Sequence, residues 1–108
     1  MSQNTEQLFG ALSEPHRVGI VELLAAHGQM NSTAISQEFP ITAAAVSQHL
    51  KVLREAGILV MEKQAQKRLY QINPQAFDEL ESWAKQMKAT WESRFTQLDE
   101  LLTKEEGA

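Results

Sequence analysis

The stretch from Ile41 to Gly57 constrains the fold more than any other part of the sequence, because it reads as one amphipathic helix with well-marked ends. Thr42 is typical of a helix N-cap, and Gly57 is typical of the position just beyond a helix C-terminus. Between them, apolar residues recur at intervals of four and three and form a single stripe. These residues are Val46, Leu50 and Leu53. The pattern predicts a helix that packs against a core with one side only.

The face opposite this stripe carries small and polar side chains, given a rotation of about 100° per residue. A helix of this kind fits the major groove of DNA, where Gln and Ser side chains can contact base edges and Lys a phosphate. An ordinary solvated surface helix would show the same pattern, so this face alone does not decide the function. The residues expected to face DNA are Ala44, Ser47, Gln48 and Lys51.

The flanking segments favour DNA binding. Residues 31–39 read as a short helix, capped by an asparagine and separated from the next helix by about three residues, which is the arrangement of a helix-turn-helix. Downstream, residues 58–63 and 68–72 are two β-prone runs that predict a hairpin. A helix-turn-helix followed by a hairpin is a winged helix-turn-helix, with the helix-turn-helix at 31–57 and the wing at 58–72.

The distribution of charge supports the same interpretation. The chain of 108 residues has a net charge of −4. Residues 41–72 hold five basic and two acidic side chains, a net charge of +3, whereas residues 1–40 carry −3 and residues 73–108 carry −4. Phosphate contacts depend on cations at the interface rather than on the overall charge. The expected contacts to phosphates or the minor groove are Lys51, Arg54, Lys63, Lys67 and Arg68.

In combination, these segments resemble the ArsR/SmtB family of bacterial winged helix-turn-helix regulators. The resemblance rests on LSEPHRVGIVELL, on AVSQHLKVLREAGIL and on the basic hairpin that ends in RLYQI, and it covers roughly residues 8–102. It implies a mainly α-helical fold with a small β-hairpin, and a dimeric repressor that binds an inverted-repeat operator in double-stranded DNA. Wings in this family usually carry a glycine at the tip, whereas this one has Gln64, Ala65 and Gln66.

The resemblance also raises metal sensing, because many members of the family bind zinc, cadmium or arsenic. The family's first site uses cysteines before the recognition helix, and this chain has no cysteine. Its second site uses histidine on the last helix, and no histidine follows His49. His16, His27 and His49 lie on different predicted elements and show no metal-ligand spacing. We therefore expect no cofactor and no response to metals.

Two further helices are expected before the helix-turn-helix. The first covers residues 5–12 with Thr5 as its cap, and the second begins at Ser13 as its cap, with a proline in its first turn. Val18, Val21 and Leu24 are its predicted core stripe. Arg17, early in this second helix, is interpreted as a solvated surface residue, with a phosphate contact as the alternative. His49 lies at the border of the apolar stripe, so packing is favoured over a DNA contact, although the family pattern includes His49 among the DNA-binding candidates.

The last third of the chain predicts one long helix at residues 74–102. Asn73 and Pro74 are typical of a helix start, and neither glycine nor proline recurs before residue 107. Such a helix spans on the order of 40 Å, whereas a domain of this size has a radius of gyration near 13 Å. A second copy of the chain is therefore expected to cover the apolar stripe of this helix, together with the first helix. The alternative is that the helix breaks and folds back on the core of its own chain. The expected interface residues are Leu8, Phe9, Leu80, Trp83, Met87, Trp91, Phe95 and Leu98.

Length and composition exclude several classes of protein. We expect one domain over residues 1–108, without a membrane span or a signal peptide and with a cytoplasmic location.

An enzyme is disfavoured, because the sequence has no glycine-rich phosphate loop, nucleophile elbow or zinc-binding His-Glu helix. Two alternatives to a simple repressor remain. One is a protein-interaction module that binds through its last helix, and the other is a sensor of a non-metal effector near Trp83, Met87 and Trp91, where packing is the competing role.

Overall fold

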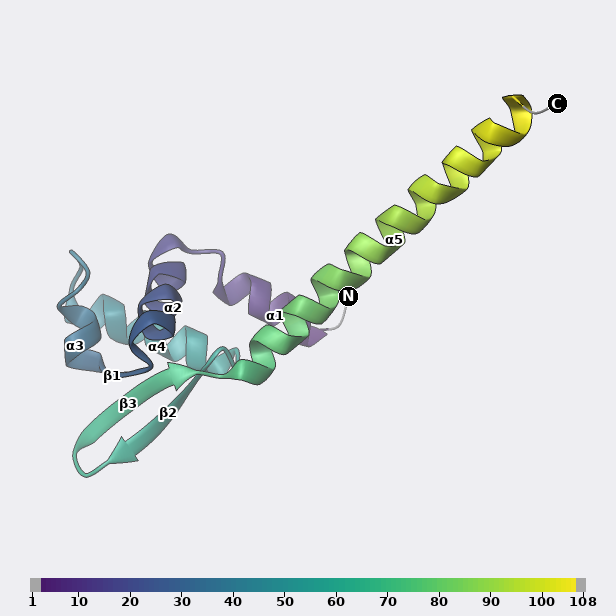
Figure 1. The fold of residues 1–108 in the computed structure, drawn as a ribbon. Helices are drawn as coiled ribbons and strands as arrows, with labels where there is room; N and C mark the ends of the chain where they lie inside the picture. Colours follow the sequence, from purple (N-terminus) through teal and green to yellow (C-terminus); the bar gives the residue numbers. More distant parts are fainter. Residues whose placement is uncertain (1–2, 107–108) are drawn as a thin grey trace.

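The computed structural model describes residues 3–106 of the chain, with side chains for residues 4–103. Helices α1 to α4 and a small sheet form a globular body, and the last helix projects from it (Figure 1). This confirms the expected winged helix-turn-helix fold. The elements, in order, are α1 (Gln3–Ala11), α2 (Pro15–His27), β1 (Gln29–Asn31), α3 (Ser32–Ser36), α4 (Ala43–Glu55), β2 (Leu59–Gln64), β3 (Lys67–Ile72) and α5 (Pro74–Glu106).

The sheet has three antiparallel strands in the order β1-β3-β2, so the wing is more than the expected hairpin. The additional strand β1 pairs Gln29 with Gln71 and Asn31 with Leu69. It is three residues long and mostly polar, which is too short for a period-2 pattern to predict it. Residues 67 and 68 of β3 extend past the end of β1 and pair with β2 alone.

The core lies against the apolar stripe of α4, as predicted. Val46, Leu50 and Leu53 are all essentially inaccessible to solvent. They pack with buried side chains from α1, α2, α3 and the base of the wing, which are Leu8, Ile20, Val21, Leu24, Ile35, Ile58, Leu59 and Tyr70. Leu8 was expected at the dimer interface, but its side chain is fully buried in this core. One prediction for α2 is wrong, because Val18 is exposed and Ile20 takes the buried position instead.

Three helix starts are confirmed. The side chains of Asn31, Thr42 and Asn73 each accept a hydrogen bond from a backbone N–H in the first turn of the following helix, at 2.8, 3.0 and 3.2 Å respectively. Each of these bonds satisfies a donor that a helix start otherwise leaves unpaired. The helix after Asn31 is shorter than predicted and ends at Ser36.

Two other predicted caps are wrong. Thr5 lies within α1, is buried, and donates a hydrogen bond from its hydroxyl to Glu79 of α5 at 3.1 Å. Ser13 instead donates to a carbonyl of α1. Glu14 caps α2, since its carboxylate accepts a hydrogen bond from the backbone N–H of Arg17 at 3.1 Å. Thr5 therefore bonds a distant part of the chain, whereas the bonds of Ser13 and Glu14 are local.

Asn73 joins three elements at the base of the wing. Its side-chain amide donates a hydrogen bond to the carbonyl of Gly57, just past α4, and its backbone N–H donates to the carbonyl of Ile58, each at 2.8 Å. Gly57 itself has a φ of 85°, a left-handed conformation that suits glycine. Asn73 is also the single residue between the end of β3 and the start of α5.

Helix α5 is continuous over 33 residues, so the alternative of a break that folds it back is wrong. The Cα radius of gyration is 20.0 Å and the longest dimension is 74 Å. Its first turns pack on α1, where the rings of Phe9 and Trp83 meet edge to face at 4.8 Å. Trp83 is therefore half-buried rather than exposed, whereas Trp91 and Phe95 are 66% and 62% exposed on the projecting part. Although α5 is long, no described helix has the apolar length that crossing a bilayer requires.

The wing tip is strained at Ala65, which has a φ of 55° in the two-residue turn between β2 and β3. For an L-residue other than glycine, this conformation destabilises the folded state by about 1–2 kcal/mol. Glycine avoids that strain but loses more conformational entropy on folding, which costs about 0.5–1 kcal/mol. We expect Ala65→Gly to raise the free energy of unfolding by about 0.5–1 kcal/mol, measured by urea denaturation. Gln66→Gly is the matched control and should lower it, because Gln66 has no positive φ. Equal effects of the two variants would contradict strain at Ala65.

Candidate nucleic-acid interface

The face of α4 opposite the core is exposed along the helix. Ala44, Ser47, Gln48 and Lys51 are all exposed, as expected for the side that would enter a groove. Arg54 is exposed in the last turn, where a cation also favours the helix dipole. Because the buried stripe anchors the other side of α4, this face is presented on a rigid support.

The cations of the wing lie on both faces of the hairpin. Lys63 pairs with Arg68 across the strands, and Gln64 pairs with Lys67. Cross-strand partners share a face and successive residues alternate, so Lys63 and Arg68 lie on one face and Lys67 on the other. Within the described part of the chain, none of these cations forms an ion pair. Like charges directly opposite each other are unfavourable, and an anion beside them would relieve the repulsion.

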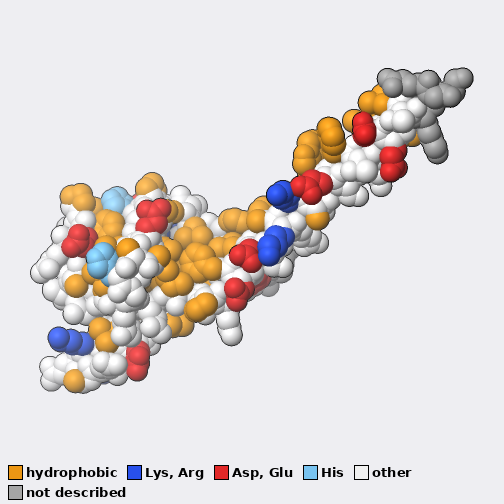
Figure 2. All heavy atoms as spheres, in the orientation of Figure 1, with side chains coloured by type: hydrophobic (Ala, Val, Ile, Leu, Met, Phe, Trp, Pro, Cys, Tyr) orange, Lys and Arg blue, Asp and Glu red, His pale blue; other side chains and the backbone are white. Residues whose placement is uncertain are grey.

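A groove of about 690 Å³ separates the wing tip from α3, where β3 extends past β1. Lys67 and Arg68 line one side, and short polar side chains line the other. A second groove of about 210 Å³ shares Ser32, Thr33 and Gln37 with the first and reaches Ser47 on α4. The polar surface therefore runs from the wing along α3 to the recognition helix. Figure 2 shows a basic patch on the wing, and along α5 it shows both acidic and basic side chains.

The residues in and next to α3 that line these grooves were not among the predicted site residues. Ser32 and Thr33 lie in α3, and Asn31 and Gln37 are the residues just before and just after it. Their polar run directly before the recognition helix was visible in the sequence. This polar run lies opposite the wing because β1 pairs with β3, and the sequence pattern did not reveal that pairing.

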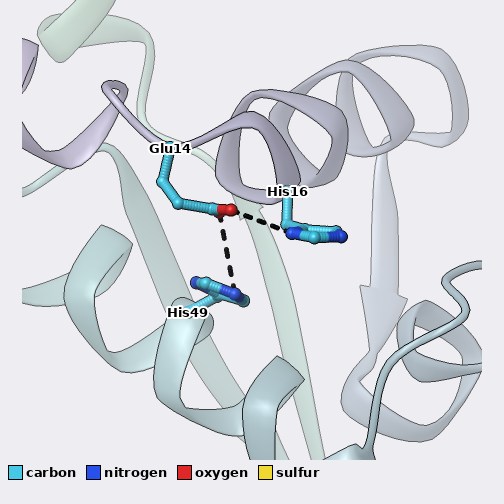
Figure 3. A group of neighbouring side chains, drawn as sticks. All are labelled: Glu14, His16 and His49. Atoms are coloured by element: carbon cyan, nitrogen blue, oxygen red, sulfur yellow. Dashed lines mark hydrogen bonds and ion pairs between the residues drawn. The ribbon is translucent and has the colours of Figure 1, made fainter.

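His49 differs from the other candidate DNA contacts, because its side chain is only 17% exposed and points from α4 toward the start of α2 (Figure 3). Its Nε2 lies 3.7 Å from a carboxylate oxygen of Glu14, and its Nδ1 lies 3.3 Å from the guanidinium of Arg17. A packed role therefore describes His49 better than a DNA contact from the exposed face of α4. Arg17 is half-buried and also donates to the carbonyl of Ala11 at 2.6 Å, so the solvated interpretation of Arg17 is wrong.

Two of the three histidines, which show no metal-ligand spacing in the sequence, lie close together in the fold. His16 Nδ1 lies 2.8 Å from Glu14, and the rings of His16 and His49 stack with centroids 5.7 Å apart. Ligand atoms of Glu14, His16 and His49 all lie within 4.8 Å of one another (Figure 3). Burial raises the pKa of Glu14, but hydrogen bonds from His16 and the Arg17 N–H and the charges of both histidines outweigh burial and hold this pKa below its ordinary value.

The chain is similar to known helix-turn-helix proteins. A family model described as a helix-turn-helix domain matches residues 12–62. The chain is 35% identical over 72 residues to the HTH-type transcriptional regulator Rv2034 of Mycobacterium tuberculosis, a match that covers 67% of this chain and 66% of that protein.

Among solved structures, a protein named a possible transcriptional regulator for arsenical resistance is 33% identical. That match covers 75% of this chain and 82% of the other, with a TM-score of 0.67. The chain belongs to the ArsR family of transcriptional regulators. The ArsR family regulator RHA00566 shares the fold, with a TM-score of 0.77 at 24% identity over 86% of this chain and 98% of that one. In this ArsR-family chain, the matched segment 12–62 contains α2, β1, α3, α4 and most of β2.

Proposed function

We propose that this ArsR-family chain is a dimeric repressor that binds an inverted-repeat operator in double-stranded DNA. Helix α4 enters the major groove, and the wing contacts the neighbouring backbone or minor groove. The observation that carries the proposal is the polar surface that joins Lys67 and Arg68, through α3, to Ser47 on the recognition helix. A strand of DNA backbone that follows this surface would meet cations at one end and base-reading side chains at the other.

Within this proposal, the side chains on α4 read bases and the cations position the duplex. Ala44, Ser47 and Gln48 contact base edges, while Lys51 and Arg54 contact phosphates. On the wing, Lys63 and Arg68 would bind a phosphate together, since they lie opposite each other on one face. Lys67 and the polar side chains of α3 contact the strand that occupies the larger groove.

The dimer forms through the exposed stripe of α5, together with α1. The projecting half of this helix exposes large apolar side chains, which Figure 2 shows beyond the globular body. Exposed patches of this kind mark interaction surfaces, and a two-fold pair of helices is the simplest arrangement that covers them. The side chains concerned are Met87, Trp91, Phe95, Leu98, Leu101 and Leu102.

The alternatives explain less of this geometry. A pure protein-interaction module gives no reason for exposed, unpaired cations on the wing. The second alternative is an effector bound near Trp83. A packing role for Trp83 is better supported, because its ring already packs on that of Phe9. The expectation of no metal response still applies to the family's two sites, for which this chain lacks ligands. The cluster of Glu14, His16 and His49 belongs to neither of these two sites.

The proposal is tested by selecting bound duplexes from a random DNA library with the purified chain. We expect an inverted repeat to be enriched and to bind one dimer, about a thousandfold or more tighter than scrambled DNA. Affinity should fall steeply with salt, because phosphate contacts release counterions. Enrichment of no sequence, with equal affinity for all duplexes, would contradict a sequence-specific regulator.

A further inference from the structure

We propose that Glu14, His16 and His49 form a binding site for a divalent transition-metal ion such as Zn²⁺. Two imidazoles and one carboxylate are ligands that such ions accept, and three protein ligands leave one position for water. The residues come from two helices, since Glu14 and His16 lie at the start of α2 and His49 lies in the middle of α4 (Figure 3). This site shares no residue with the cysteine positions or the last helix considered above.

The distances suit a metal ion. Zinc-to-nitrogen and zinc-to-oxygen bonds of about 2.0–2.1 Å at tetrahedral angles place neighbouring ligand atoms about 3.3–3.4 Å apart. In the structure, Glu14 Oε1 lies 2.8 Å from His16 Nδ1 and Glu14 Oε2 lies 3.7 Å from His49 Nε2, and one ligand atom from each of the three residues lies within 4.8 Å of the others. Small rotations of exposed or half-buried side chains would therefore close the site.

Metal binding requires each ring to present a bare nitrogen. Arg17 can only donate, so His49 Nδ1 accepts its hydrogen bond and Nε2 carries the ring proton. When an ion takes Nε2, the proton moves to Nδ1 and the hydrogen bond from Arg17 is lost. His16 changes in the same way, from a proton on Nδ1 facing Glu14 to a proton on Nε2. The ion therefore replaces two contacts that are made through ring protons.

A bound ion would also cross-link α2 to the recognition helix. Ligand binding to the folded state alone raises the thermal midpoint of unfolding. The chain has three histidines, and His27 lies outside the cluster with its ring bonded to the carbonyl of Leu23. His27 is therefore a matched control for the loss of one imidazole.

The test uses the full chain without an affinity tag, freed of metal and titrated with Co²⁺ by visible absorption and with Zn²⁺ by calorimetry. We expect one ion per chain with micromolar or tighter affinity, and Zn²⁺ should raise the thermal midpoint. His16→Gln should weaken binding about 100-fold or more, since a lost ligand exceeds the 10–100-fold effect of an outer partner. His27→Gln should bind as the unmodified chain does, and circular dichroism checks that both variants fold.

Nuclear magnetic resonance of the unmodified chain gives a second test that needs no variant. Zn²⁺ should shift the ring signals of His16 and His49 and leave those of His27 unchanged. The proposal is overturned if the chain binds no stoichiometric ion at micromolar concentration. It is also overturned if His16→Gln binds as tightly as the unmodified chain, or if the signals of His27 shift in place of those of the cluster.

Discussion

Trp91→Asp is expected to convert the protein from a dimer into a monomer. Trp91 is 66% exposed, and the later turns of α5 project away from the globular body (Figure 1). It lies on one stripe with Met87 and Leu98, at spacings of four and seven residues, so a partner helix that covers one covers all three. Placing a carboxylate there removes a large apolar contact and leaves a charge with no partner, at a cost of several kcal/mol.

Sedimentation velocity measures this change directly. Ala89→Asp is the matched control, because it introduces the same side chain two residues away, on the opposite face of the helix. The control should remain dimeric and bind the operator normally. A Trp91→Asp protein that also stays dimeric, with unchanged operator affinity, would show that α5 does not form the interface.

Gln48→Ala and Lys67→Ala are expected to weaken DNA binding in different ways. Gln48 is exposed on the recognition helix, where its amide can pair with an adenine edge, so its loss should cost roughly 1–3 kcal/mol on the operator alone. Lys67 lines the groove beside α3 and would contact phosphate. Its loss should weaken specific and scrambled duplexes alike and reduce the salt-dependence slope by about one.

Fluorescence titration of both duplexes at several salt concentrations separates the two effects. Lys85→Ala is the control for losing a cation, because Lys85 lies on α5 in an ion pair with Glu81, far in sequence from the wing. It should change neither affinity nor slope. Equal losses on both duplexes for Gln48→Ala would mean that α4 does not read bases at this position.

The elements that the sequence predicted correctly depend on neighbours in the chain. Thr42 bonds an amide three residues away, and the stripe of α4 needs only helical periodicity. Thr5 also has a good capping side chain, but its partner is Glu79, which is 74 residues distant. Strand β1 likewise forms only because β3, some 40 residues later, offers an edge. Local chemistry could not show either of these long-range bonds.

The candidate site divides in the same way. The exposed face of α4 followed from periodicity, whereas only the register of the wing shows that Arg68 shares a face with Lys63. The groove beside α3 needs the third strand, and the cluster of Glu14, His16 and His49 needs α2 to pack on α4. Residues that are 33 or more positions apart carry no spacing signal, so only the folded chain brings them together.

The single residue Asn73 has a consequence for the DNA that such a dimer can accept. It bonds the end of the recognition helix, and it alone separates the wing from α5, so each DNA-reading unit is held stiffly to the helix that would pair the two copies. The distance and rotation between the two units would then be a fixed property of the protein. One base pair added at the centre of an operator turns one half-site by about 35° and moves it by about 3.4 Å relative to the other. With one connecting residue on each side, the protein has almost no freedom to follow that change, so the operator spacing should be as strictly defined as its sequence.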